Sequence, residues 1–244
     1  MIFISQDDKA KVPIGKTAAK LQAPLLMHVE YKVRLSDHDF VVGPRHLLTP
    51  SVYAGIVIKP NAMGRREAVT YSGPTYIAIR SGKHSSSTAT THAKDLRKVF
   101  SLGDFEPLVK GLDGKVKPVL MVSVDGGPDE NPRYSSVILH AISHFKEYDL
   151  DAVFVFTNAP GRSAFNRVER RMAPLSRELS GVVLPYDRCG NHLDSSGKTV
   201  DPQLERLNFH HAGSVFKLPT YFALQITRPN FKGLLFIICR QYFG

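Results

Sequence analysis

The chain has 244 residues, with 32 Lys and Arg against 22 Asp and Glu and a net charge of +10. That length suits one large domain or two small ones, and an apolar content of 43% is enough for a buried core, so we expect a folded chain rather than wholesale disorder. The excess positive charge favours a polyanionic partner, nucleic acid before membrane.

Cysteine usage and apolar runs indicate the compartment. Two cysteines cannot build a disulfide framework and suit a reducing environment. The opening MIFI is too short for the apolar region of a signal peptide, and the apolar run at 234–239 is too short to span a bilayer. We therefore expect a soluble intracellular protein with no membrane partner.

The first third of the chain is predicted to be rich in β-strands, punctuated by Gly, Pro and Asn. Residues 27–34 alternate between apolar and polar side chains, as a half-buried strand does. The expected strands cover residues 1–6, 25–34, 52–58, 67–71 and 75–80.

The middle of the chain alternates between helix and strand. Thr90 or Thr91 is the expected cap of a helix running to about residue 100, and 118–124 and 151–156 read as strands buried on both faces. A helix over 135–148 is predicted to bury Val137, Leu139, Ile142 and Phe145. Another helix, over 162–179, is predicted to kink or break at Pro174.

This order predicts an α/β protein with a mixed sheet and helices packed on it. A last helix is expected to begin near Pro202 and to meet Pro219. Beyond about residue 217 no period of either kind is visible. We therefore divide the chain into a core, 1–217, and a poorly specified tail, 218–244.

Three segments present acids where metal chemistry would need them. Asp125 follows the apolar run VLMVSV and precedes two glycines, which places a carboxylate at the C-terminal end of a strand. A turn-forming Asp explains that segment equally well. Glu169 shares the predicted helical stripe of Phe165 and Met172, where it needs a metal or an arginine, Arg170 or Arg171, to compensate its charge.

The first segment, ISQDD, carries two adjacent acids, Asp7 and Asp8. Neighbouring side chains on a strand point to opposite faces, so only one of them can face a shared site. We assign Asp7 to that site and keep Asp8 as the alternative. A charged β-turn explains this segment alone as well as a site does.

Together, the segments 4–15, 122–134, 166–176 and 204–213 resemble the catalytic core of the DDE transposase and integrase superfamily, loosely the mariner-like and Mutator-like enzymes of eukaryotic transposons. The resemblance covers residues 1 to about 217. It implies an RNase H-like mixed sheet flanked by helices, with acids on the first strand, a later central strand and a following helix.

Residue by residue, the resemblance implies metal-binding roles for Asp7 (or Asp8), Asp125 and Glu169, with Asp7, Asp125 and Glu169 catalytic. The family chemistry uses two Mg²⁺ or Mn²⁺ ions roughly 3.5–4 Å apart to cut or join DNA. Basic residues flank these acids and are expected to contact phosphates, namely Lys9, Lys11, Arg133 and Arg170. The implied location is the nucleus, and a homo-oligomer is compatible with the sequence.

The chain departs from the family at both ends. Only six residues precede Asp7, which leaves no room for a DNA-reading module, and the closing helix runs into Pro219. We expect an incomplete fold, a remnant of a transposable element. The alternative to a DNA nuclease or strand-transferase is a non-enzymatic, basic nucleic-acid-binding remnant.

Two further motifs are rejected. SGKHSSS at 81–87 lacks the first glycine and the final Ser/Thr of a phosphate loop. Cys189, His192, His210 and His211 fit no common zinc spacing.

Overall fold

The computed structural model describes residues 1–16, 42–159, 161–162, 165–179, 182–226 and 237–242. The strand expected at 25–34 lies outside these residues. The described strands are β1 (Ile2–Asp8), β2 (Val12–Pro13), β3 (Leu47–Gly55), β4 (Thr75–Ser81), β5 (Val119–Val124), β6 (Ala152–Thr157) and β7 (Ile237–Tyr242). The α-helices are α1 (Ala89–Phe100), α2 (Glu106–Val109), α3 (Ser135–Glu147), α4 (Glu169–Glu178) and α5 (Pro202–Ile226). Short 3-10 turns cover Pro60–Ala62, Arg66–Ala68 and Gly103–Phe105.

The strands form one mixed sheet in the order β6-β5-β1-β3-β4-β7, with the short β2 paired to β3. The segment from β1 through β3 to β4 is antiparallel, whereas β5 pairs parallel to β1 and β6 parallel to β5. Parallel neighbours need a crossover connection, which α3 supplies between β5 and β6. The α/β class predicted from the sequence is confirmed.

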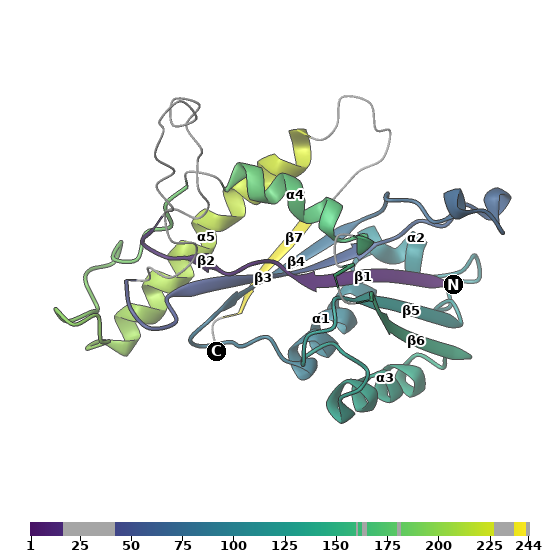
Figure 1. Ribbon diagram of the computed structural model, residues 1–244, viewed down its shortest axis with the longest axis horizontal. Coiled ribbons are helices and arrows are strands. Elements are labelled where there is room, and N and C mark those ends of the chain that lie inside the picture. The colour runs from purple at the N-terminus through teal and green to yellow at the C-terminus, as the bar shows by residue number, and fades with distance from the viewer. Residues whose placement is uncertain (17–41, 160, 163–164, 180–181, 227–236, 243–244) are drawn as a thin grey trace.

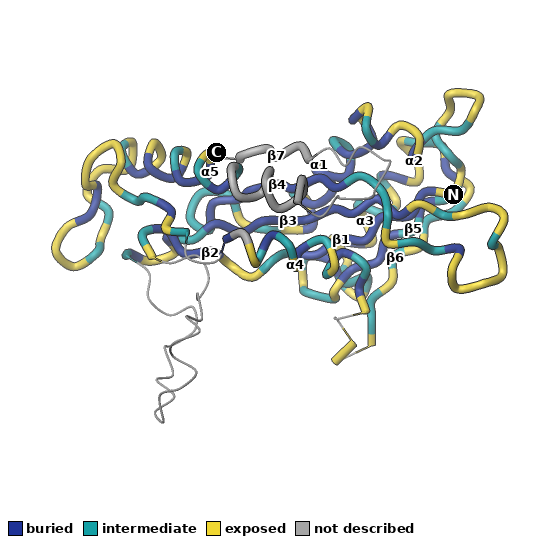
Figure 2. The backbone as a smooth tube through the Cα atoms, turned by 90° about the horizontal axis from the view of Figure 1, so that it is seen from above, coloured by how far each residue is buried: buried dark blue, intermediate teal, exposed yellow. Residues whose placement is uncertain are grey.

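Helices cover both faces of this sheet, with α4 and α5 on one face and α1 and α3 on the other (Figure 1). Each face has its own core. Phe3 of β1 packs with Met172 and Leu175 of α4, while Ile2 and Ile4 pack with Leu96 of α1. The central strands β1 and β3 are buried along nearly their whole length (Figure 2). The side chains of alternate β1 residues therefore pack into the two different cores, one on each face of the sheet.

Several expectations about local structure are wrong. No strand forms at 67–71, where the 3-10 turn Arg66–Ala68 is followed by a single bridge from Val69 to Ile58. The cap of α1 is Thr88, which accepts a hydrogen bond from the N–H of Thr91, and Thr91 in turn closes a capping box.

The apolar side of α3 is also less buried than predicted. Val137 is buried, but Leu139, Ile142 and Phe145 are exposed. Strand β6 is an edge strand with Phe154 exposed, so it is not buried on both faces. Both outcomes have one cause, since α3 and β6 lie at the edge of the sheet, where only one side of each is covered.

Helix α4 begins at Glu169, seven residues later than predicted from 162, and it runs through Pro174 to Glu178. Helix α5 likewise continues through Pro219 to Ile226, so the division at 217 falls within a helix. Residues 237–242 form β7, parallel to β4.

Candidate metal centre

Strands β1 and β5 bring the first two acids to the same level of the sheet. Their parallel register pairs Ile2 with Leu120 and Ser5 with Ser123. Two residues further along each strand, the same offset aligns Asp7 with Asp125. Asp7 is 8% exposed, and Asp125 directly follows the last residue of β5.

Asn166 positions the third acid. Its Oδ1 accepts hydrogen bonds from Ser5 Oγ at 2.5 Å and Ser123 Oγ at 3.2 Å, and its Nδ2 donates to the carbonyl of Gln6 at 3.3 Å. The N–H of Val168 donates to Ser5 Oγ at 3.0 Å. This buried clamp ties the start of α4 to β1 and β5, and so sets Glu169, the first residue of the helix, beside them.

The three acids line one pocket of about 540 Å³. Its lining residues are Asp7, Asp8, Lys9, Ala10, Asp125, Glu169, Met172, Ala173 and Ser176. The structure thus gathers the three sequence-predicted acids from a strand, a strand end and a helix start.

Burial and mutual repulsion raise the pKa values of two of these acids. Burial, and then the carboxylates of Asp125, Glu169 and Asp8, raise the pKa of Asp7 to about 8. Burial and Asp125 also raise the pKa of Glu169, against the lowering effect of Lys9. Like charges at a shared site disfavour ionisation in this way, and a divalent cation would reverse the effect.

Lys9 is the basic residue of this pocket. Its Nζ donates a hydrogen bond to Ser176 Oγ at 2.5 Å, on the inner side of α4. Burial lowers the pKa of Lys9, and the nearby Glu169 carboxylate opposes that shift. Lys9 therefore lies where it can neutralise one acid or contact an incoming phosphate.

The other predicted phosphate contacts are spread outside the pocket. Lys11 is exposed beyond β1. The Arg170 guanidinium stacks on the ring of Tyr71 at 3.8 Å, and Arg133 lies over Tyr134 at 4.8 Å, in the loop after β5. Lys9 lines the pocket, and these three basic residues do not.

Asp7, Asp125 and Glu169 are not among the groups of described residues whose ligand atoms all lie within 4.8 Å of one another. Among the described residues, two other groups have His, Asp or Glu ligand atoms all within 4.8 Å of one another and could hold a metal. One comprises Asp8, His92 and Asp129, and the other His46, His192 and Glu205. Neither group was predicted from the sequence, because each joins segments far apart in the chain.

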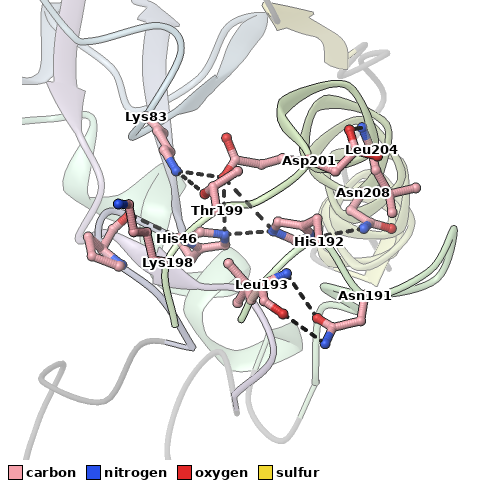
Figure 3. Close-up of polar contacts among 12 residues, drawn as sticks. His46, Lys83, Asn191, His192, Leu193, Lys198, Thr199, Asp201, Leu204 and Asn208 are labelled. Carbon is pink, nitrogen blue, oxygen red and sulfur yellow. Dashed lines mark hydrogen bonds and ion pairs between the residues drawn. The ribbon is translucent and has the colours of Figure 1, made fainter. Parts of the chain in front are cut away.

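The second of these groups forms a closed hydrogen-bond network (Figure 3). Asn208 Oδ1 accepts from the N–H of Cys189, which turns its Nδ2 toward His192 Nδ1 at 2.9 Å. His192 Nδ1 is therefore an acceptor, and its Nε2–H donates to His46 Nε2 at 2.8 Å. The ring of His46 completes the chain by donating from Nδ1 to the carbonyl of Pro44 at 3.2 Å.

Glu205 in this group already has cationic and hydroxyl partners. Lys83 Nζ donates to its Oε2 at 2.6 Å, His84 Nε2 lies 2.9 Å from its Oε1, and Thr199 Oγ1 also donates to it. Every ring nitrogen and both carboxylate oxygens are thus satisfied by protein atoms. The network joins the segment before β3, the loop before α5 and α5 itself without needing an ion.

The chain matches no family model, no curated protein and no solved structure. Within the described residues, no helix is long and apolar enough to cross a membrane.

Proposed function

We propose that the chain is a metal-dependent nuclease or strand-transferase core that acts on DNA phosphodiester bonds, with an RNase H-like fold of the DDE transposase type. One observation carries the proposal: the β1–β5 register and the Asn166 clamp place Asp7, Asp125 and Glu169 around one pocket. This distribution over a first strand, a neighbouring parallel strand and a following helix is the one that the DDE resemblance requires.

The residues fit a pair of divalent ions. Hard cations prefer carboxylate oxygens, and the raised pKa of Asp7 reflects its burial together with the negative charges of Asp125 and Glu169. Asp7, Asp125 and Glu169, which line one pocket, would hold the ions. When bound, two Mg²⁺ or Mn²⁺ ions activate a water or a 3′-hydroxyl and stabilise the leaving oxygen.

The surrounding side chains would orient the substrate. Lys9, fixed by Ser176, offers a cation beside Glu169 for one non-bridging phosphate oxygen. The positive charge of the whole chain would add a salt-sensitive, sequence-independent attraction to DNA. Glycine at 126, with φ of 114°, keeps the backbone after Asp125 open to close approach.

The test is nicking of supercoiled plasmid by the purified protein in Mg²⁺ or Mn²⁺. Cleavage should be lost in Asp125→Asn and Glu169→Gln and retained in the matched control Asp113→Asn, which changes an exposed turn residue far from the pocket. Absence of cleavage by the folded wild-type chain with either metal would contradict the proposal. Salt-dependent DNA binding that is unchanged by both pocket variants would instead support a binding remnant.

A further inference from the structure

Asp8 lies on the opposite face of β1 from Asp7, beside His92 of α1 and Asp129 of the loop after β5. We propose that these three residues form a separate site for one divalent transition-metal ion, Mn²⁺ or Zn²⁺, with Glu130 as a fourth contributor. The inference does not depend on the nuclease proposal, because it uses none of the three acids Asp7, Asp125 and Glu169, although Asp8 also borders their pocket.

The hydrogen bonds of Tyr53 fix the protonation of the His92 ring. The Tyr53 hydroxyl has one hydrogen, which it donates to Asp95 Oδ2 at 2.8 Å. Asp95 also accepts from Arg80 and is therefore a carboxylate. The Tyr53 oxygen lies 2.6 Å from His92 Nδ1, so it accepts the Nδ1–H. In the neutral ring, the lone pair is consequently on Nε2.

That lone pair faces carboxylate oxygens. Nε2 of His92 lies 3.3 Å from Asp129 Oδ2, a hydrogen-bonding distance if Nε2 carries the proton, 3.9 Å from Asp8 Oδ1, and 3.8 Å from Glu130 Oε1, which also accepts from Gln6. Ser87 Oγ, at 2.8 Å, is a hydroxyl that can donate to the ring. Acceptors that face one another repel, here beside a buried ring and two aspartates that are 24% and 25% exposed, and a cation between them removes the repulsion.

A second observation points to the same place. Asp8 Oδ1 is buried and has no hydrogen-bond partner within the described structure. Leaving such an oxygen unsatisfied is costly, even though the Asp8 side chain as a whole is 24% exposed. An ion coordinated by Asp8, His92 and Asp129 would satisfy it.

The spacing and donor types indicate which ion is bound. A cation about 2.0–2.2 Å from each ligand can bridge atoms up to about 4.4 Å apart, which includes all three separations from Nε2. Mg²⁺ takes oxygen ligands and keeps most of its water, whereas an imidazole nitrogen among carboxylates suits Mn²⁺ or Zn²⁺. In other metal sites, a hydrogen bond from the second ring nitrogen orients the metal-bound histidine. The Nδ1–H bond to Tyr53 would have that role here.

The experiment removes the proposed nuclease site first. In the full-length double variant Asp125→Asn, Glu169→Gln, isothermal titration with Mn²⁺ and with Zn²⁺ should show one site. Adding His92→Asn or Asp129→Asn should abolish it. Tyr53→Phe should weaken binding by about 10–100-fold, as loss of an outer-shell partner does. The matched control is His192→Asn, which removes a histidine of the metal-free network and should leave the affinity unchanged.

Two results would overturn the site. One is a folded double variant that binds neither Mn²⁺ nor Zn²⁺, or that binds them equally well after Asp129→Asn. The other is a nitrogen-15 spectrum of the metal-supplemented protein with both ring nitrogens of His92 protonated, which would make His92 an imidazolium paired with the acids. A thermal melt of each variant identifies any that fails to fold, and Asp129→Asn, in a half-buried loop, replaces His92→Asn if needed.

Discussion

Asp7 and Asp125 lie at the same level of two parallel strands, because the register pairs Ser5 with Ser123 two residues before each acid. Neighbouring strands are about 4.8 Å apart, a distance at which two carboxylates repel unless a cation or a proton separates them. Burial, and then the carboxylates of Asp125, Glu169 and Asp8, raise the pKa of Asp7 to about 8.

The first prediction concerns removal of one charge from this pair. Asp125→Asn should reduce metal-dependent nicking by more than about 100-fold, since a ligand matters more than its outer-shell support. In the presence of a metal chelator, the same variant should have a melting temperature equal to or higher than that of the wild type, because the Asp125 carboxylate no longer repels Asp7. A lower melting temperature with nicking retained would show that Asp125 has a structural role only.

The second prediction concerns pH. The folded pKa of Asp7 is about 8, above the value near 4 of an unfolded chain. The native state therefore binds more protons at Asp7 between these values, and the contribution of Asp7 to the stability of the metal-free protein should fall as pH rises from about 4 to about 8. The slope from this group is at most about 1.4 kcal/mol per pH unit.

Urea denaturation in chelator across this pH range measures that slope. Asp7→Asn should remove the Asp7 contribution from it, leaving that of Glu169, whereas Asp113→Asn, at an exposed turn, should leave the slope unchanged. With saturating Mn²⁺ the Asp7-dependent trend should reverse. The ion binds the ionised carboxylates of the folded state, so its stabilising effect grows as pH rises. A wild-type slope that survives in Asp7→Asn would assign the effect to other groups.

The third prediction concerns the Asn166 clamp. Asn166→Ala leaves buried hydroxyl and backbone groups of β1 and β5 without a partner, at a cost of about 2–3 kcal/mol in the free energy of unfolding. Nicking should fall in step, because Glu169 is no longer fixed beside β1. Asn191→Ala, which removes two bonds within an exposed loop, is the control and should change neither quantity by a comparable amount.

The fourth prediction separates two lysines. Lys9→Gln should weaken DNA binding and reduce the salt dependence of the binding constant by about one phosphate contact, with a larger loss of nicking. Lys11→Gln, at an exposed position two residues away, should lower affinity without a specific effect on cleavage. Equal effects of the two substitutions on cleavage would remove Lys9 from the pocket's chemistry.

The fifth prediction concerns the His46–His192–Glu205 network. Glu205→Gln leaves Lys83 with a weaker partner and should cost about 1–3 kcal/mol of stability. The loss should be the same with and without a chelator, and DNA cleavage should persist. Stability of the wild type that depends on Zn²⁺ and disappears with Glu205→Gln would overturn the metal-free assignment.

Sequence patterns predicted the central strands well, because β1 and β5 are short apolar runs that end in acids. From the sequence, Asp7 and Asp8 could only be assigned to opposite faces of the strand. The packing of Phe3 and Ile4 into different cores shows which layer each acid faces. Glu169 was expected inside a longer helix. Its place at the helix start depends on the contacts of Asn166 with β1 and β5, and no periodicity carries such long-range bonds.

The remaining differences have similar causes. The burial of Leu139 and Phe145 could not be predicted, since an apolar stripe does not reveal that its helix lies at the edge of a sheet. The pairing of His46 with His192 across 146 residues has no local signature either. Spacing rules identify metal and hydrogen-bond sites only where the ligands are close in the chain.

Strand β1 lies between an antiparallel neighbour, β3, and a parallel one, β5. A slip of β1 by one residue would carry Asp8 to the layer of Asp125 and Asp7 to the layer of His92, and it would also exchange Phe3 and Ile4 between their cores. Both ladders would have to shift together for this to happen. The apolar residues Phe3 and Ile4 therefore fix the strand register that decides which face each acid occupies, although they belong to neither site. A substitution at Phe3 can disturb both sites by shifting the register of β1.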